Sequence, residues 1–462
     1  MSPPISDQDS EREQRLYREL QETLEREDWD SFHDAVEGVP TPEIADALHR
    51  LEDDQRHTAF RAFPRRLAAR LVAHVSPERA GRLLDHLDDD HRRTVFHYLQ
   101  PDDRVQLLEN LPDETTRELM NLLDKSDIEE TRKLLQFPDE SVGRLMTPNC
   151  VRIRPELTVK EALEQVRERG KESEIVSLVF VVDQDSKLVD TIRLRDLILS
   201  DRDATVGEQL DHSFISLSPT QDREEAVEAL SRYDEIALPV VDGDGKFLGI
   251  VTVDDVLDVA EQEATEDFHK GGAMKPLERT YSETSTFILF RSRIGWLLIL
   301  IFVNLISSGV IAFFEETLES IIALAFFIPL LIDSGGNTGA QSATLMVRAI
   351  AVGDVELRDW FKAFVKEIGV GMSLGLTMGL ASVFLGLFRG DWMLGIIVGL
   401  SMTAIVVVAN LVGTVLPFLL TRLKVDPAVA SSPLITTIAD ATGLFIYFGI
   451  ATLFLQAGYF AG

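Results

Sequence analysis

Long apolar stretches fill the C-terminal part of the chain, and polar positions dominate the rest. A helix needs about 20 residues to cross a bilayer, and five stretches are long enough: Ile294–Phe314, Ser320–Val347, Ile368–Phe388, Trp392–Thr421 and Pro427–Gly462. The second carries one charge, Asp333, the fifth carries one, Asp440, and the others carry none. This pattern predicts an all-α membrane domain of five helices over residues 286–462.

A shorter period marks residues 35–124. An apolar doublet, followed three residues later by another apolar residue, recurs every 12 positions, and its third members are Val39, Leu51, Phe63, Val75, Leu87, Leu99, Leu111 and Leu123. Proline or a polar residue follows each one, which ends one short helix and can start the next. Because no two-turn unit can bury its apolar face alone, the units should stack into an all-α superhelix. We expect this domain over residues 35–137, after an acidic helical lead-in at 1–34. Such arrays usually serve as scaffolds.

Residues 138–267 change to a mixture of helices and strands in two similar halves. We expect helices over Thr158–Arg169 and Asp222–Tyr233, and strands over Val176–Val182 and Phe247–Val253. The run LPVVDGDGKFLGIVTVDDVLDV, with its Gly-rich hairpin turn, resembles the second half of a CBS-domain pair. A helix from Asp254 should then connect this α/β pair to the membrane domain, with its linker, over 254–285.

The CBS resemblance implies a role for nucleotides, because CBS pairs often bind adenine nucleotides such as ATP. Thr252 and Asp255 stand at the usual polar contacts. Arg193 occupies the corresponding hydroxyl position of the first half, so that site is expected to be impaired.

Charge separates the two parts of the chain. The formal net charge is −31, and from Phe290 onward there are only 9 basic and 11 acidic residues. An acidic surface repels nucleic acid and attracts cations, although a salt-adapted host would also produce such a surface. The single Cys150 allows neither an intrachain disulfide nor a Cys-based zinc site. The charged N-terminus has no apolar core typical of a signal peptide, so the first 289 residues are expected in the cytosol.

Basic residues near the five spans predict their orientation. Eight of them fall on one side: Arg291, Arg293, Arg348, Arg358, Lys362, Lys366, Arg422 and Lys424. Only Arg389 falls on the other side. By the positive-inside rule, the N-terminus is cytosolic and the C-terminus lies outside. The segment Glu356–Glu367, with aromatic residues on one face, is expected to lie along the cytosolic membrane surface.

Two membrane segments carry unusual polar chemistry. The second span holds the run DSGGNTGAQ from Asp333, whose glycines and polar side chains could serve helix packing or line a pore. Asp440 is a carboxylate in mid-span, which costs roughly 2.5–3.5 kcal/mol on insertion scales. Because no basic residue lies inside the five stretches, a transported cation or water must compensate its charge.

The runs SGGNTGAQSATLMVRAIAVGDV and DPAVASSPLITTIADATGLFIYF resemble the MgtE family of magnesium channels. The order of parts also agrees: superhelix, CBS pair, connecting helix and five spans. The resemblance implies a homodimer in the plasma (inner) membrane that conducts Mg²⁺. Its central pore would be lined by the second and fifth spans.

The resemblance also implies roles for individual residues. The implied pore ion-binding residues are Asp440, Thr436 and Asp426, and the implied pore-lining motif is Gly335, Gly336, Asn337, Gly339 and Gln341. The implied regulatory Mg²⁺ ligands are Asp222, Glu224, Asp234, Asp255, Asp258, Glu263, Glu266, Asp267 and Asp103, with Asp102 as a weaker candidate. Ser432 departs from the family pattern, where some members carry Asn. In this hypothesis cytosolic Mg²⁺ bridges the acids and closes the pore.

Two other functions stay open. A secondary carrier could couple a divalent cation to H⁺ or Na⁺ through Asp333 and Asp440. A membrane sensor with a nucleotide-binding CBS pair would not need Asp440 in mid-span. An enzyme is disfavoured, because the sole cysteine and the scattered histidines form no catalytic constellation. The sequence does not decide selectivity among Mg²⁺, Mn²⁺, Co²⁺ and Ca²⁺.

Overall fold

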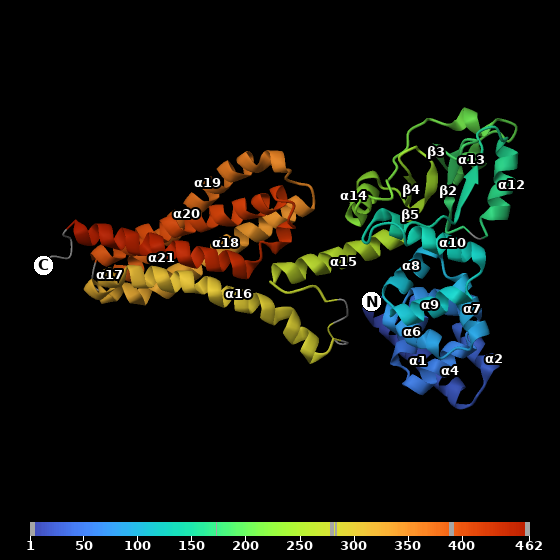
Figure 1. The fold of residues 1–462 in the computed structure, drawn as a ribbon, viewed down its shortest axis with the longest axis horizontal. Coiled ribbons are helices and arrows are strands. Elements are labelled where there is room, and N and C mark those ends of the chain that lie inside the picture. Colours follow the sequence, from blue (N-terminus) through green and yellow to red (C-terminus); the bar gives the residue numbers. More distant parts are fainter. Residues whose placement is uncertain (1–4, 172, 278–280, 282–283, 388–391, 458–462) are drawn as a thin grey trace. The chain divides into compact units, whose positions relative to one another are not determined.

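The computed structural model describes the chain except for residues 1–4, 172, 278–280, 282–283, 388–391 and 458–462. Arg389 and Gly462, which enter the topology expectation, lie outside the described residues. The chain divides into two compact units, Met1–Ala260 and Glu261–Gly462. The first contains an all-α domain and an α/β domain, and the second contains the apolar helices (Figure 1), which confirms the predicted fold class.

Ten helices build the all-α domain. They are α1 (Ile5–Glu25), α2 (Trp29–Val36), α3 (Thr41–Arg50), α4 (Asp53–Ala62), α5 (Arg65–Ala73), α6 (Pro77–Asp85), α7 (Asp89–Tyr98), α8 (Pro101–Glu109), α9 (Asp113–Leu122) and α10 (Lys125–Leu134). All eight apolar positions of the 12-residue repeat belong to or pack against one core. Leu16, Leu20 and Leu24 of α1 join the same core, so the lead-in helix is packed onto the superhelix.

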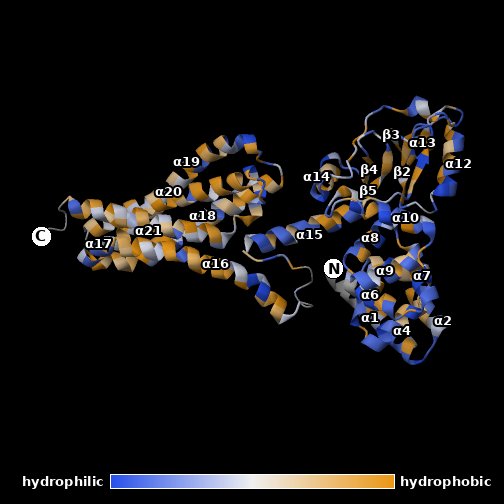
Figure 2. Ribbon diagram, in the orientation of Figure 1, coloured by the Kyte–Doolittle hydropathy of each residue, from blue (hydrophilic) through white to orange (hydrophobic). Residues whose placement is uncertain are grey.

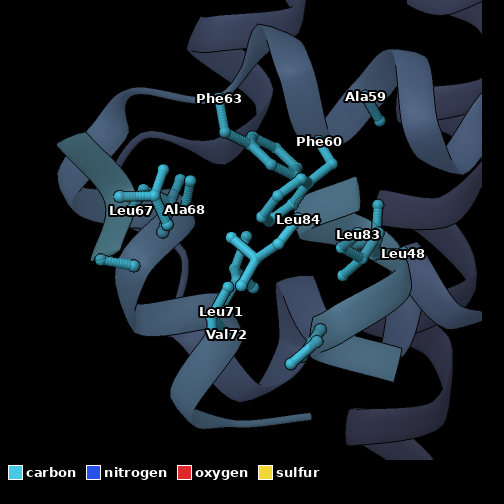
Figure 3. Packing of buried hydrophobic residues seen from close by; sticks show 14 of the residues in the cluster. Leu48, Ala59, Phe60, Phe63, Leu67, Ala68, Leu71, Val72, Leu83 and Leu84 are labelled. Atoms are coloured by element: carbon cyan, nitrogen blue, oxygen red, sulfur yellow. The ribbon is translucent and has the colours of Figure 1, made fainter. Parts of the chain in front are cut away.

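The short helices need partners for the carbonyl groups at their C-terminal ends. Arg56 donates from Nε to the carbonyl of Leu48, and Arg92 donates from Nε to the carbonyl of Leu84, in both cases eight residues back. These arginines therefore link α4 to α3 and α7 to α6. Phe60 and neighbouring apolar side chains fill the space between the helices (Figure 3).

The α/β domain has two sheets. In the first half, β1 (Cys150–Ile153) pairs in parallel with β2 (Ile175–Val182), which pairs antiparallel with β3 (Leu188–Arg193). In the second half, β4 (Ala237–Val241) pairs antiparallel with β5 (Phe247–Thr252). The accompanying helices are α11 (Val142–Leu145), α12 (Val159–Arg169), α13 (Leu194–Leu199), the 3₁₀ turn η1 (Val206–Gln209), α14 (Arg223–Tyr233) and α15 (Val253–Gly271).

The predicted helices of this domain begin where their capping residues stand. Thr158 and Glu161 form a reciprocal capping box at α12, and Asp222 caps α14. The two halves meet through an apolar cluster in which Phe180 and Phe247 stack with ring centroids 5.1 Å apart. Each half also has an apolar cluster of its own, and this third cluster joins the two.

Among its described residues, the second unit contains five helices that are long and apolar enough to cross a membrane. Its elements are α16 (Thr286–Phe313), α17 (Glu315–Ser320), η2 (Ile322–Phe327), α18 (Ile328–Ala351), η3 (Leu357–Asp359), α19 (Trp360–Leu387), α20 (Trp392–Arg422), η4 (Pro427–Val429) and α21 (Ser432–Gln456). Figure 2 shows apolar residues along all five long helices. Helix α20 contacts α18, α19 and α21 and is the most buried of the five.

The segment Glu356–Glu367, which is expected to lie along the cytosolic membrane surface, is continuous with the third spanning helix. Helix α19 begins at Trp360 and runs without a break to Leu387. Trp360 and Phe361 therefore belong to the first turn of the third spanning helix. A 28-residue helix is about 42 Å long at about 1.5 Å per residue, so it has enough length to span the apolar layer and extend beyond it.

Small residues set the separation of α18 and α20. A methyl group added at Gly413 of α20 would overlap the carbonyl oxygen of Gly339, and it would lie 3.1 Å from the backbone nitrogen of Ala343. Both of these atoms belong to the α18 backbone, which cannot move aside as a flexible side chain could. Close backbone approach at small residues is a common way to pack helices in a membrane.

We therefore predict that Gly413→Ala destabilises the membrane unit by about 1–3 kcal/mol, the usual cost of overpacking. The measurement is thermal unfolding of the detergent-solubilised protein. Gly309→Ala is the control, because nothing lies within 4 Å of a methyl group added there. Equal melting temperatures for the two variants would contradict this account of the helix contact.

Candidate cation sites

A group of carboxylates gathers where α8 faces the start of α15, within the first unit. Asp102 and Asp103 lie in the first turn of α8, and Asp254 and Asp255 lie in the first turn of α15. Glu174 joins them from the residue before β2. Asp102 is only 8% exposed, and its Oδ1 has no hydrogen-bond partner among the described residues.

Burial and mutual repulsion disfavour the charged forms of these groups. Burial raises the pKa of Asp102 well above its usual range, and the charges of Asp255, Asp103 and Glu174 add to the effect. Burial likewise raises the pKa of Asp103 to about 6 and the pKa of Glu174 to about 7. The pKa of Asp255 rises to about 7 for the same reason, although a hydrogen bond from Thr252 opposes the shift.

Such a cluster is suited to a divalent cation, which turns repulsion between carboxylates into attraction. In the part of the chain that the structure describes, no three Asp, Glu, His or Cys side chains are grouped to hold a bare ion. Mg²⁺ gives up its water reluctantly, so carboxylates at wider spacing can bind the hydrated ion through retained water. Glu174, whose Oε2 is also buried without a partner among the described residues, was not predicted. No local sequence signal distinguishes it from the surrounding acids.

The other predicted acids of the second CBS half do not converge. Asp222 accepts a hydrogen bond from the backbone of Glu224 at 3.0 Å and caps the start of α14. Asp234 ends the same helix, 11 residues long, in a left-handed conformation with φ 52°. A capping role accounts for both aspartates, and the helix separates them.

The predicted nucleotide contacts lie beside the carboxylate cluster. Thr252 is buried, and its hydroxyl donates to Asp255 at 2.7 Å. Arg193, at the corresponding position of the first half, forms an ion pair with Glu235 at 3.0 Å. Asp255 is thus shared between the predicted cation site and the predicted nucleotide site.

A lysine occupies the centre of a second acidic group, within the second unit. Lys270, near the end of α15, lies 2.5 Å from a carboxylate oxygen of Glu266 and 2.5 Å from one of Asp426. Asp426 directly precedes η4, in the loop between α20 and α21. Burial opposes the charge of Lys270, but hydrogen bonds to Asp426 and Glu266 raise its pKa. Burial, followed by the charge of Asp426, raises the pKa of Asp267.

Glu266 and Asp426 were predicted as cation ligands, and the structure shows a protein cation between them. Asp267 lies close enough to Asp426 for the charge of Asp426 to raise its pKa. The sequence contained a signal for part of this arrangement, since Lys270 follows Glu266 by four residues, the spacing of neighbours on one helix face. The contact with Asp426, 156 residues further along the chain, had no such signal.

The membrane helices bring Asp440 of α21 and Asp333 of α18 close enough for their charges to interact. Thr436 lies one turn before Asp440, and its methyl group contacts Gly336 of α18, where an added Cβ would lie 3.1 Å away. Asp440 forms no ion pair with any residue that the structure describes. It lies partly exposed in the isolated chain.

The predicted pore-lining motif divides between two faces of α18. Gly335, Gly336 and Gly339 are buried against α20 and α21, so these glycines serve helix packing. Asn337 and Gln341 are exposed and follow Asp333 at intervals of four residues. These three polar side chains form one face of an otherwise apolar helix, which we name the α18 polar face.

Family models identify the parts of this architecture. A model described as a divalent cation transporter matches residues 328–450, an MgtE intracellular N domain matches 39–140, and CBS domains match 142–203 and 206–261. Two solved structures resemble about half of this chain, which covers 99% of each of them. They are the cytosolic domain of the Mg²⁺ channel MgtE in complex with ATP (31% identity, TM-score 0.51, 53% of this chain) and the soluble part of a magnesium transporter (28%, 0.52, 55%).

The protein is thus a membrane-spanning transporter with an attached helical domain and CBS pair. The magnesium transporter MgtE of Thermus thermophilus is 39% identical over 96% of this chain and 100% of its own length. The magnesium transporter MgtE of Bacillus subtilis is 32% identical over 86% of this chain and 91% of its own length. The chain belongs to the MgtE family.

A first prediction concerns the buried carboxylate Asp102. Asp102→Asn should stabilise the metal-free protein by about 1–3 kcal/mol, because it removes a buried carboxyl group whose charged form burial and the neighbouring acids disfavour. It should also reduce the stabilisation that millimolar Mg²⁺ gives. Thermal unfolding in EDTA and in Mg²⁺ measures both effects, and Asp46→Asn, at an exposed position of α3, is the control.

The same carboxylates determine a pH dependence. Their pKa values in the folded protein lie at about 6 to 7 for Asp103, Glu174 and Asp255, above those of the unfolded chain. The folded state therefore binds more protons between about pH 4 and pH 7, and its metal-free stability should rise as the pH falls through this window. A metal-free stability that falls over the same window, or an unchanged slope in Asp102→Asn, would count against the cluster.

A further prediction concerns Lys270. Lys270→Met should lower the stability of the metal-free protein by about 1 kcal/mol, because Glu266 and Asp426 lose their shared cation at a partly exposed site. Mg²⁺ should restore most of the loss by replacing the lysine charge. Lys275→Met, at an exposed position after α15, is the control, and equal losses in both variants would refute a specific role for Lys270.

Proposed function

We propose that this protein is a Mg²⁺-selective channel that mediates magnesium uptake across the plasma membrane and is closed by cytosolic Mg²⁺. The observation that carries the proposal is the membrane carboxylate Asp440, which has no ion-pair partner among the described residues and lies near Asp333. A carboxylate inside a membrane is expensive and needs compensation. A passing hydrated cation supplies it.

The proposed pore is formed by two copies of the chain. The α18 polar face is exposed in the single chain, and polar side chains on a spanning helix normally face a protein partner or a water-filled path. Pairing two chains along α18 and α21 would place this face and both copies of Asp440 around one path. Two carboxylates acting through retained water favour Mg²⁺, whose hydration shell is tightly held.

The proposed gate uses the acidic groups outside the membrane. When cytosolic Mg²⁺ is high, the ion would bind between Asp102, Asp103 and Asp255 and hold the helical domain against the CBS pair. Asp258, Glu263, Glu266 and Asp267 follow later in the same helix, α15. When Mg²⁺ is low, repulsion between the carboxylates would separate the parts and release the pore.

Domain boundaries and orientation complete the proposal. Four parts are assigned to the cytosol: the lead-in (1–34), the superhelix (35–137), the CBS pair (138–267) and the connecting helix with its linker (254–285). The membrane domain follows at 286–462. The C-terminus is assigned to the outside. The flanking basic residues support this orientation.

A nucleotide is a second proposed ligand of the CBS pair. Two observations support this proposal. The cytosolic domain of a relative was solved in complex with ATP, and the buried Thr252, at the end of β5, donates a hydrogen bond to Asp255. Because Asp255 also belongs to the carboxylate cluster, nucleotide and Mg²⁺ would influence each other at this point.

The decisive experiment concerns Asp440. Asp440→Ala should lower Mg²⁺ uptake by at least about tenfold, the loss expected when a charge contact worth about 1.4 kcal/mol or more is removed. The folded dimer should be retained, because an unpaired charge is being deleted. The measurement is Mg²⁺ flux into proteoliposomes, with Asp354→Ala, at an exposed position after α18, as the control.

Patch recordings with stepped cytosolic Mg²⁺ separate a channel from a carrier. Single-channel openings that cease as Mg²⁺ rises support the proposed function. Flux that requires a proton or Na⁺ gradient, without unitary openings, would favour the carrier that couples Asp333 to Asp440. Wild-type flux through a folded Asp440→Ala dimer would remove this residue from the ion path.

A further inference from the structure

A cavity in the all-α domain is lined mainly by basic side chains, although the chain as a whole is acidic. It has a volume of about 260 Å³ and lies between α3, α4 and α6. Its lining residues are Leu48, His49, Asp53, Arg56, His57, Val75, Arg79, Arg82, Leu83 and His86. Six of these ten side chains are arginine or histidine, and only Asp53 is acidic, in a chain whose net charge is −31.

Two of the three arginines that line this cavity, Arg56 and Arg82, differ in how they are held. Arg56 is held in place, because its guanidinium donates to the carbonyls of His49 and Leu51 and to the carboxylate of Asp53. It therefore contributes a fixed positive charge. Arg82 forms no ion pair or side-chain hydrogen bond with any residue that the structure describes, so its donors are available to a ligand.

Two histidines form a flat wall. The rings of His57 and His86 stack with centroids 3.4 Å apart and planes 9° apart. His86 Nδ1 lies 2.8 Å from the carbonyl oxygen of Arg82 and must carry the proton there, because a carbonyl can only accept. Burial lowers the pKa of His57, and the positive charge of His86 adds to the effect. Two stacked rings repel each other when both are protonated, so an anion beside them would favour their charged forms.

We propose that this cavity binds a small phosphate-bearing anion. Arginine is the side chain best suited to phosphate oxygens, which it contacts through several donors at once. The apolar side chains of Leu48 and Leu83, which lie next to each other at one edge of the core (Figure 3), form an apolar floor beneath these charges. The cavity is an order of magnitude larger than the about 10–15 Å³ that holds one water molecule, so it has room for a polyatomic ion.

The ligand site is independent of the proposed channel mechanism. It uses none of the carboxylates assigned to cation binding, none of the CBS residues and none of the membrane helices. Its position on α4 and α6 places it in the superhelix, so the proposed scaffold would also have a binding function of its own.

The test is binding of inorganic pyrophosphate to the full-length protein in detergent and in Mg²⁺-free buffer, measured by isothermal titration calorimetry. The wild type should bind saturably at one site per chain. Arg82→Gln should weaken binding about tenfold or more, as expected for loss of a charge-assisted contact. Arg82→Lys should retain part of the affinity, because it preserves the charge.

Two control variants show whether the binding is specific to this cavity. Arg93→Gln removes the same charge from an exposed position of α7 outside the cavity, and it should bind like the wild type. Thr252→Val alters the CBS pair and should also leave pyrophosphate binding unchanged. Absence of saturable binding to the wild type, or equal losses in Arg82→Gln and Arg93→Gln, overturns the proposal, as does loss of binding in Thr252→Val alone.

A second titration with a water-soluble, short-chain phosphatidic acid identifies the source of the phosphate. Binding of pyrophosphate alone points to a free phosphate compound, and tighter, Arg82-dependent binding of the lipid points to a headgroup. Both results support a phosphate site in this cavity. Thermal unfolding of each variant confirms that the binding losses do not reflect misfolding.

Discussion

Carboxylates that the folded chain itself does not neutralise impose the central constraint on this protein. Asp102 is buried with an unpartnered oxygen, and Asp440 lies in a membrane helix without an ion pair among the described residues. Both positions cost free energy in the absence of a cation. This cost favours cation binding at each site, because a bound cation removes an unfavourable free energy that the metal-free protein already has.

Lys270 shows the alternative solution to the same problem. Glu266 and Asp426 belong to the same acidic region as the predicted ligands, yet a lysine ammonium lies 2.5 Å from both. A fixed protein cation gives a permanent link between the end of α15 and the loop before α21, whereas a bound ion gives one that depends on concentration. The family likeness alone would have assigned both acids to Mg²⁺. The geometry instead makes their availability depend on the position of one lysine.

The membrane unit combines two requirements on one helix. The buried glycines of α18 allow α20 and α21 to approach closely, and the α18 polar face lies on the exposed side. A helix with 3.6 residues per turn can satisfy both because residues at intervals of four stay on one side. The run DSGGNTGAQ is therefore one motif in the sequence and two surfaces in space.

The sequence by itself determined the features that depend on local pattern. The 12-residue apolar period predicted the superhelix and its core positions, and charge-free stretches predicted five spanning helices, because hydrophobic burial and backbone satisfaction in a membrane act on runs of neighbouring residues. Long motifs also revealed the family. Asp440 could be found because a single charge stands out in an apolar stretch.

Only the tertiary structure decided which distant residues meet. Glu174 joins Asp102 and Asp255, Lys270 meets Asp426, and His57 stacks on His86, although no periodicity links the members of each group. It also showed that α19 begins at Trp360 and runs unbroken to Leu387, so the aromatic residues at its start belong to the third spanning helix. Burial, ion pairing and pKa depend on what packs around a side chain from other elements. That environment is a property of the folded chain and is not written in the neighbouring residues.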